Sequence, residues 1–364
     1  MAQKVVIGMS GGVDSSVAAY LLVKAGYEVI GVTMQIWDSQ ISPGETESGG
    51  YSERTCCSLS AVEDARRVAS RLDIPFYVLN FKEIFTKEVV EYFTASYIEG
   101  ETPNPCILCN NKVKFQALLN KGQAMGAGFI ATGHFAIKGY DSTVGRYTLS
   151  RGKDLHKDQS YVLFGLSQEQ LAQALFPLGD LSKEEVRQIA RAEQLPTAEK
   201  AESQEICFIP DNDYGRFLRE RRPESIQPGE IVDTKGRVLG RHQGVSFYTI
   251  GQRKGLGIAA PQPLYVVDLL PAERRVVVGT ADQVYREGAH VAQVNWVSIP
   301  APTEKIKALV KIRYSATPTP ALIEPKGDGV YVRFDEPQRA VTPGQAMVFY
   351  DGDLLLGGGF IRRD

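Results

Sequence analysis

The chain begins with a glycine turn set between a strand pattern and a helix pattern. Residues 4–10 form an apolar run typical of a buried strand, and residues 15–25 carry apolar side chains at helical spacing. Between them stands Ser10-Gly-Gly-Val-Asp-Ser-Ser16. Two glycines let the backbone turn tightly and bring N–H groups against an anion, at the positive end of the following helix. The pattern predicts a phosphate-binding loop on an α/β fold; the alternative is a glycine-rich turn with a Ser/Asp cap.

Strand and helix patterns continue to alternate through the first half of the chain. Ser60 with Glu63 and Ser182 with Glu185 form capping boxes, each opening a helix. Such repetition predicts a parallel, Rossmann-like sheet covered on both faces. The expected strands are residues 27–34, 76–81 and 129–132, and the expected helices are residues 60–72, 83–98, 114–125 and 183–195. The polar stretch 35–54 predicts a loop above the sheet.

After residue 222, the sequence consists of short runs in which apolar and polar residues alternate, separated by prolines and glycines. Residues 233–236 and 326–329 have sequences typical of hairpin turns. This pattern predicts that the second half of the chain is all-β. We expect three domains: an α/β nucleotide-binding catalytic domain over residues 1–215, a small β-rich domain over 216–284 and a C-terminal β-barrel over 285–364.

Composition narrows the class of protein. With 364 residues, 43% of them hydrophobic and 23% charged, the chain is typical of a multidomain globular protein. No apolar run approaches the roughly 18 residues that cross a bilayer, and no signal peptide pattern opens the chain, so we expect a cytoplasmic protein without a membrane partner. The formal net charge is −2, but residues 216–254 hold nine Lys/Arg against four Asp/Glu. Such an excess can dock a polyanion, or can simply be a solvated face.

The phosphate loop carries its own chemical signal. Ser10, Ser15 and Ser16 add hydroxyl donors, and Asp14 can hold Mg²⁺ on bound phosphates. The Gly-Lys-Ser/Thr ending of a Walker A motif is absent from the loop. The loop resembles the SGGxDS pyrophosphatase loop of enzymes that split ATP into AMP and pyrophosphate. Those enzymes adenylate a substrate oxygen and then displace AMP with nitrogen or sulfur, because an AMP ester leaves easily.

Five cysteines are too few for a disulfide scaffold. Cys106 and Cys109 lie in the proline-rich segment TPNPCILCN, which predicts a rigid loop before a helix, where the helix dipole favours thiolate. Cys207 lies in the apolar, strand-like segment SQEICFI and would by itself be a buried filler.

The phosphate loop, NPCxxCN and SQEICFI together closely resemble the bacterial tRNA-specific 2-thiouridylases of the PP-loop ATP pyrophosphatase superfamily. Further matching segments follow in order along the whole chain: residues 56–58, 131–134, 157–161, 251–255, 313–314 and 343–345. The resemblance implies a fold similar to that of the adenine nucleotide alpha hydrolases. It also implies a tRNA-uridine 2-sulfurtransferase that thiolates C2 of the wobble uridine in tRNAs for Glu, Gln and Lys.

The resemblance implies a role for each motif. Cys207 would carry sulfur as a persulfide and Cys109 would be the nucleophile, with a Cys109–Cys207 disulfide as an expected end state. A cysteine desulfurase or a sulfur-relay protein would supply the sulfur. ATP, with Mg²⁺, would bind Gly8, Met9, Ser10, Gly11, Gly12, Val13, Asp14, Ser15, Met34 and Gly133. The tRNA would contact Asn104, Pro105, Cys106, His134, Lys157, Asp158, Gln159, Arg313, Tyr314 and Gln345.

Cys106 leaves a rival mechanism open. Some family members have Asp at this position and others have Cys. A third thiol beside Cys109 and Cys207 would allow a three-cysteine 4Fe-4S cluster, with the transferred sulfur held on the open iron. A zinc site built from Cys56, Cys57 and the CxxC pair would require adjacent cysteines to chelate one metal, which is awkward geometry, so Cys56 and Cys57 read as fillers.

Other readings of the same motifs also stand. Without the resemblance, residues 157–159 are interpreted as the start of a helix and His134 as a core histidine. Arg313 and Tyr314 offer a cation and a π face, which suit phosphate contact and stacking on an RNA base. Asparagine, argininosuccinate and GMP synthetases share the loop but use nitrogen nucleophiles, so they would not need Cys109 and Cys207. A non-catalytic RNA-binding or iron–sulfur protein that senses ATP would form no AMP.

Overall fold

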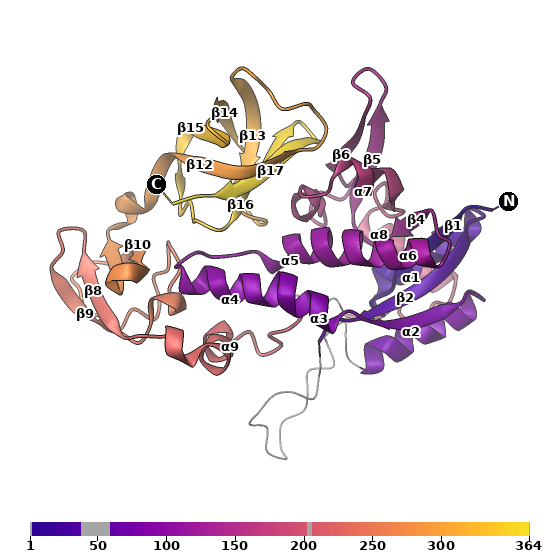
Figure 1. Cartoon of the computed structure of the whole chain (residues 1–364), viewed down its shortest axis with the longest axis horizontal. Helices are drawn as coiled ribbons and strands as arrows, with labels where there is room; N and C mark the ends of the chain where they lie inside the picture. Colours follow the sequence, from indigo (N-terminus) through magenta and orange to yellow (C-terminus); the bar gives the residue numbers. More distant parts are fainter. Residues whose placement is uncertain (1, 38–58, 202–205, 364) are drawn as a thin grey trace, which may run out of the picture. The chain divides into compact units, whose positions relative to one another are not determined.

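The computed structural model describes residues 2–37, 59–201 and 206–363 (Figure 1). The chain forms two compact units. The first comprises residues 1–89, 106–213 and 353–355, and the second comprises residues 90–105, 214–352 and 356–364. Most of the expected loop at residues 35–54, as well as Cys56 and Cys57, lies outside the described residues. None of the described helices is both long and apolar enough to cross a membrane.

A five-stranded parallel sheet organises the first unit. The strand order is β3-β2-β1-β4-β7, and each neighbouring pair is parallel. The strands are β1 (Lys4–Gly8), β2 (Glu28–Gln35), β3 (Phe76–Asn80), β4 (Phe129–Ala131) and β7 (Ala174–Leu175). Three consecutive residues of β1, Val5, Val6 and Ile7, are fully buried, as expected for a strand covered on both faces.

Three helices share one core with this sheet. They are α1 (Val13–Lys24), α2 (Leu59–Arg71) and α8 (Lys183–Ala192), which bury Val17, Val68 and Val186 in the cluster that contains Val5 and Ile7. Ser182 and Glu185 form the predicted capping box of α8, because each side chain bonds the backbone N–H of the other. Ser60 lies inside α2, so its prediction as a cap is wrong.

The segment that carries Cys106 and Cys109 is helical. A helix begins at Pro105 and runs through α5 (Pro105–Leu108), the π-helical segment η2 (Cys109–Ala117) and α6 (Leu118–Ala124). The prediction of a rigid loop here is wrong, because proline is well suited to the first position of a helix, where its missing N–H has no partner to lose. The expected helix at residues 83–98 is confirmed as α3 (Lys82–Phe85), the π-helical η1 (Thr86–Val90) and α4 (Glu91–Ile98).

The segment around Cys207 is a turn, so its prediction as a strand is wrong. The Ile209 N–H donates to the Ile206 carbonyl at 2.9 Å.

A hairpin in the first unit has no clear signal in the sequence. It consists of β5 (Ala136–Asp141) and β6 (Arg146–Arg151), and β6 also pairs with Leu354 and Leu355. Short helices lie in the irregular parts of both units. The first unit contains η3 (Ser160–Leu163) and α7 (Gln168–Gln173), and the second contains α9 (Tyr214–Arg221) and the one-turn segments η4 (Pro223–Ser225), η5 (Val245–Phe247), η6 (Pro271–Glu273) and η7 (Ala281–Val284).

The second unit contains the expected β structures. A four-stranded sheet has the order β10-β11-β8-β9 and buries an apolar cluster that includes Ile231, Val266 and Val276. Its strands are β8 (Gly229–Asp233), β9 (Val238–His242), β10 (Tyr265–Leu270) and β11 (Arg275–Gly279).

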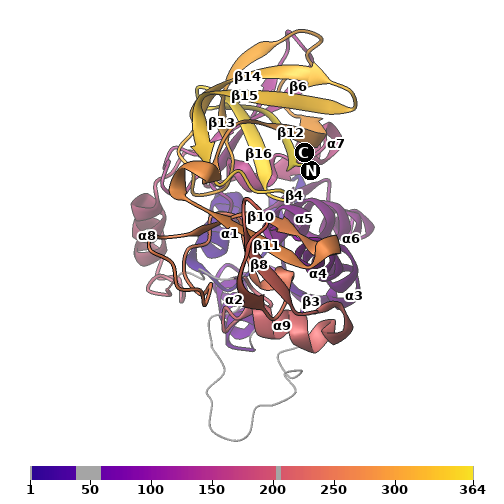
Figure 2. The ribbon, with the colours of Figure 1, turned by 90° about the vertical axis from the view of Figure 1, so that its left-hand side faces the viewer.

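The remaining strands form an antiparallel barrel in the order β12-β15-β14-β13-β16-β17, closed by pairing of β12 with β17 (Figure 2). These strands are β12 (Tyr285–Trp296), β13 (Ile306–Lys311), β14 (Thr319–Lys326), β15 (Gly329–Arg339), β16 (Ala346–Asp351) and β17 (Leu354–Ile361). Closure leaves no unpaired sheet edge. The predicted fold class, a Rossmann-like sheet followed by a small β domain and a β-barrel, is confirmed.

Candidate active site

Serine hydroxyls hold the loop between β1 and α1 in shape. The Ser10 N–H donates to Ser15 Oγ at 3.2 Å, and the hydroxyls of Ser15 and Ser16 donate to the Gly12 carbonyl at 3.1 and 2.8 Å. Gly12 is the N-cap of α1 and has no side chain to cap it. The loop therefore lies over the positive end of α1, as an anion-binding loop requires.

Close backbone packing surrounds this loop. A Cβ at Gly11, whose φ is +69°, would lie 2.2 Å from the Ala61 carbonyl oxygen of α2. A Cβ at Gly133 would lie 2.8 Å from the backbone of Asp14 and Ser15. Both positions therefore require glycine, and the chain after β4 lies directly against the first turn of α1.

The remaining residues of the implied ATP site lie nearby. The Met34 Cε, at the end of β2, is 3.8 Å from where a Cβ on Gly8 would be. Met9 is buried, and its carbonyl accepts a hydrogen bond from the Thr33 hydroxyl at 2.8 Å. The structure thus brings Gly8, Met34 and Gly133 to the region of the Ser10–Ser16 loop.

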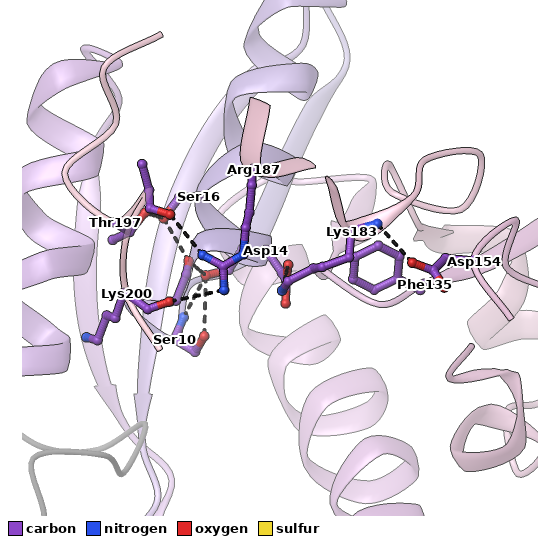
Figure 3. A network of polar contacts seen from close by, with 12 residues as sticks. Ser10, Asp14, Ser16, Phe135, Asp154, Lys183, Arg187, Thr197 and Lys200 are labelled. Carbon is purple, nitrogen blue, oxygen red and sulfur yellow. Dashed lines mark hydrogen bonds and ion pairs between the residues drawn. The ribbon is translucent and has the colours of Figure 1, made fainter. Parts of the chain in front are cut away.

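Lys183 is a site residue that the sequence motifs do not indicate. It is the first residue of α8, and its Nζ donates to Asp14 Oδ1 at 2.6 Å (Figure 3). The residue is 9% exposed, its ammonium lies 5.8 Å from the Phe135 ring centroid, and its backbone N–H donates to Asp154. In the sequence, only the capping box of Ser182 and Glu185 points toward Lys183, because it fixes the start of α8 at this lysine. A buried ammonium therefore stands beside a phosphate loop that contains no basic residue of its own.

Several contacts attach residues 197–200, which precede the Cys207 turn, to the elements around the loop. The Thr197 hydroxyl donates to Ser16 Oγ at 2.9 Å (Figure 3), and Arg187 of α8 donates to the Ala198 carbonyl at 3.0 Å. Lys200 Nζ pairs with Asp64 Oδ2 of α2 at 2.5 Å. Residues 197–200 are therefore fixed to α1, α2 and α8.

The two implied catalytic thiols are on segments that contact one element, α3. Cys109 begins η2, which packs against α3, and both Cys109 and Cys207 are partly exposed. The Phe208 ring, adjacent to Cys207, lies 5.6 Å from the Phe85 ring of α3 in an edge-on contact. Cys106, in the first turn of α5, is exposed.

The structure gives no support to a three-cysteine cluster. Within residues 2–37, 59–201 and 206–363, no three His, Cys, Asp or Glu side chains come together as a metal site. The alternative in which Cys106, Cys109 and Cys207 ligate an iron–sulfur cluster therefore finds no support among these residues. The zinc alternative involves Cys56 and Cys57, which lie outside the described residues.

Two of the residues implied to bind tRNA also support the backbone. The buried Asp158 accepts hydrogen bonds from the Gly152 N–H at 3.2 Å and the Ser160 hydroxyl at 3.0 Å. Gln159 Oε1 accepts from the Phe135 N–H at 3.1 Å. These bonds hold the start of η3 against the residue before β5 and the residue after β6, while Lys157 is half-buried, and the contact of these side chains with tRNA stays a prediction.

His134 has the environment of a core histidine. It is buried, its Nδ1 lies 2.5 Å from Thr132 Oγ1, and its ring contacts Phe115 and Phe176. Burial, and then the positive charge of Lys114, hold the pKa of His134 well below its usual range. The ring is therefore neutral near pH 7, and its contact with tRNA stays a prediction.

Family models match three successive parts of the chain. Residues 3–211 match the tRNA methyl transferase HUP domain, residues 215–280 the tRNA methyl transferase PRC-barrel domain, and residues 286–361 the aminomethyltransferase beta-barrel domain. The tRNA-specific 2-thiouridylase MnmA of Carboxydothermus hydrogenoformans is 54% identical over 362 residues, covering 99% of this chain and 98% of that protein. The chain belongs to the tRNA-specific 2-thiouridylase family.

Other members of the 2-thiouridylase family are equally similar. The MnmA of Moorella thermoacetica is 53% identical over 357 residues, covering 98% of each chain. These matches confirm the resemblance drawn from the motifs. Among solved structures, NMN synthetase from Francisella tularensis aligns with 55% of this chain and 66% of its own at 18% identity, with a TM-score of 0.32, too low to carry an argument.

In this 2-thiouridylase chain, the second unit holds the other residues implied to bind tRNA. Arg313 and Tyr314 follow β13 and are exposed, with Lys311 Nζ 5.6 Å from the Tyr314 ring centroid. Asn104 is half-buried and Pro105 is buried. The half-buried Gln345 donates its amide to the Thr102 carbonyl at 2.7 Å.

The basic stretch at residues 216–254 is partly neutralised within the 2-thiouridylase chain. Arg221 and Arg222 pair with Glu91 at 2.6 and 2.8 Å. Arg216 pairs with Glu220, and Arg237 with Asp233. The other basic residues of the stretch are exposed to an approaching polyanion: Arg219, Lys235, Arg241, Arg253 and Lys254. Because Glu91 lies outside the stretch, the charge excess counted from the sequence overstates the positive field of this surface.

Proposed function

We propose that this chain is an ATP-dependent tRNA-uridine 2-sulfurtransferase. It thiolates C2 of the wobble uridine in tRNAs for Glu, Gln and Lys through an adenylated uridine and a cysteine persulfide, releasing AMP and pyrophosphate. The observation that carries the proposal is the buried Lys183–Asp14 pair at the glycine loop. An ammonium and a carboxylate at the start of a helix suit a triphosphate and its Mg²⁺.

The residues of the loop fit a nucleotide. Glycines at positions 11 and 133 let backbone pack against backbone, at Ala61 and at Asp14 and Ser15, where any side chain would collide, and this packing fixes the shape of the loop. Bound ATP supplies the adenylyl group that turns the uridine O2 into a leaving group. Lys183 would then move its hydrogen bond from Asp14 to a phosphate oxygen, and Asp14 would be available to hold Mg²⁺. The hydroxyls of Ser10 and Ser15 would orient the same phosphates.

Cys207 and Cys109 would carry the sulfur. The terminal sulfur of a Cys207 persulfide attacks the adenylated C2, and AMP leaves with the former O2. The Cys109 thiolate then attacks the Cys207 sulfur and breaks the S–S bond, so sulfur stays on the uridine and a Cys109–Cys207 disulfide forms. An external thiol reductant restores both thiols. The contact of both segments with α3 supports this pairing.

We further propose that a cysteine desulfurase or a sulfur-relay protein charges Cys207, and that the enzyme works in the cytoplasm, where thiols are kept reduced. The domains would be a catalytic domain over residues 1–215, a small β domain over 216–284 and a barrel over 285–364. Asn104, Pro105 and Cys106 would meet the target base, and Lys157, Arg313 and Tyr314 would contact the tRNA around it.

The test uses the full chain with ATP, Mg²⁺, a cysteine desulfurase with cysteine, and unmodified tRNA. We expect AMP, pyrophosphate and 2-thiouridine to appear together, and Cys109→Ser or Cys207→Ser to abolish 2-thiouridine. A nitrogen-transferring synthetase would be unaffected by either substitution, and a non-catalytic ATP sensor would yield no AMP. Either result would reject the proposal.

A further inference from the structure

The α4–α5 connection, residues 99–104, leads directly into Pro105 and Cys106 and takes its hydrogen bonds from distant parts of the chain. The Thr102 carbonyl accepts from Gln345 Nε2 at 2.7 Å, and the Thr102 N–H donates to the Pro343 carbonyl at 2.9 Å. Both backbone polar groups of Thr102 are therefore satisfied by the turn before β16.

That turn approaches the connection at backbone distance. Gly344 has a φ of +86°, and a Cβ there would lie 2.8 Å from Glu101 Cβ and 3.0 Å from the Thr102 nitrogen. The turn is fixed to the barrel, because the Gly344 N–H donates to the Ile361 carbonyl and the Ile361 N–H donates to the Gln345 carbonyl, at 3.0 and 2.9 Å. Gln345 is thus a rigidly mounted donor.

The other end of the connection is held in a similar way. Arg363 Nη2 donates to the Gly100 carbonyl at 3.1 Å, and Nη1 donates to the Leu269 carbonyl of β10. An arginine at the last carbonyls of a helix satisfies acceptors that have no partner within the helix. The connection is therefore fixed at Gly100 and again at Thr102.

We infer that Gln345 is a positioning residue, which holds Thr102 and thereby sets where α5 begins. Asn104, Pro105 and Cys106 follow within four residues. The short bond to Thr102 uses one of the two N–H groups of the Gln345 amide, so Gln345 acts on thiolation through the connection, whatever contact its other N–H and its carbonyl oxygen make. The inference rests on the proposed function, in which those three residues meet the target base.

Gln345→Met tests this inference, because methionine has similar length and apolar volume but no donor. In the tRNA-free protein, we expect hydrogen–deuterium exchange of residues 99–104 to accelerate about tenfold, as the loss of one buried hydrogen bond implies. At saturating tRNA, the rate of thiolation should fall about tenfold.

Gln338→Met is the matched control. This glutamine of β15 donates to the Glu336 carbonyl at 2.9 Å, within its own strand, and its loss should leave exchange of residues 99–104 and thiolation unchanged. If the Gln345→Met protein does not unfold cooperatively, it is not properly folded, and Gln345→Asn takes its place in the test. The asparagine side chain is shorter by one methylene and does not reach Thr102, so the expected results are the same.

Unchanged exchange together with a raised Kd for tRNA would overturn the inference and assign Gln345 a direct RNA contact. The exchange measurement needs neither tRNA nor turnover. Failure of the proposed function would be recognised by a wild-type protein that does not thiolate tRNA. In that case the exchange measurement still tests the role of Gln345.

Discussion

Lys183 Nζ and Asp14 Oδ1 are 2.6 Å apart although 169 residues separate them in the chain. The pair joins the first turn of α8 to the first turn of α1, so the positive ends of two helices meet at one loop. This meeting of charges explains how a loop without a lysine of its own suits a triphosphate.

Lys183→Met should lower the rate of AMP formation about 100-fold, because it removes a buried charge aimed at the phosphates. AMP and pyrophosphate would be measured with unmodified tRNA and a sulfur donor. Lys153→Met is the control, since Lys153 is exposed and pairs with Glu185 at 2.9 Å near the same helix start. Equal rates for Lys183→Met and wild type would exclude a phosphate-binding role for Lys183.

Thr197→Val should lower the free energy of unfolding by about 1 kcal/mol, because it deletes the buried hydroxyl that donates to Ser16. Urea denaturation measures this change. Thr303→Val, at an exposed position, should leave stability unchanged. A Thr197 variant as stable as wild type would show that this bond does not fix residues 197–200.

Glu185 should make stability depend on pH in strongly acidic solution. Its hydrogen bond from the Ser182 backbone N–H, and then that from Lys153, lower the pKa of Glu185 from 4.5 to about 2. A depressed carboxyl pKa gives stability that is full above pH 4.5 and is lost as pH falls toward 2. In urea unfolding, the free energy of unfolding of wild type should therefore exceed that of Glu185→Gln by an amount that shrinks as the pH falls from 4.5 toward 2. An advantage that stays constant from pH 5 to pH 2.5 would contradict the assignment.

His134 should destabilise the protein as pH falls below its ordinary pKa of 6.5, since burial favours the neutral ring. The lowered pKa means that the unfolded chain binds the proton first, so stability is full above pH 6.5 and declines below it. His134→Phe keeps a ring and removes the titration. We expect the stability of this variant to change less than that of wild type between pH 7 and pH 5. Parallel pH profiles for the two proteins would argue against a buried neutral His134.

The proposed persulfide mechanism predicts that protein purified anaerobically thiolates tRNA without stoichiometric iron or sulfide, and that Cys106→Ser still thiolates tRNA, because Cys109 and Cys207 alone carry the sulfur. Colorimetric iron and sulfide analysis, with 2-thiouridine measured beside it, checks both statements. Cys109→Ser is the comparison and should be inactive. Stoichiometric iron that is lost in Cys106→Ser would restore the cluster mechanism.

The local parts of the fold were predictable because short-range rules decide them. The β1–loop–α1 unit and the capping box at Ser182 follow from glycine freedom and helix capping within a few residues. Cys106 shows where such rules compete: two prolines suggested a loop, but Pro105 occupies the first position of a helix.

The missed parts depend on contacts between distant residues. Lys183 reads as an ordinary helical lysine until folding buries it against Asp14. Asp158 and Gln159 look like polar surface until their bonds to Gly152 and Phe135 are known. Periodicity and spacing carry no information about such pairings, so the motifs led to a predicted site but not to the contacts that support it.

The hydrogen bond between Thr102 and Gln345 spans 243 positions. During synthesis on the ribosome, residues 99–104 therefore emerge long before the groups that hold them, and Arg363 is among the last residues made. A nascent or prematurely terminated chain can complete its glycine loop while the start of α5 is still unsupported. The support of residues 99–104 therefore comes from a late part of the chain, whereas the serine bonds of the glycine loop lie within residues 10–16.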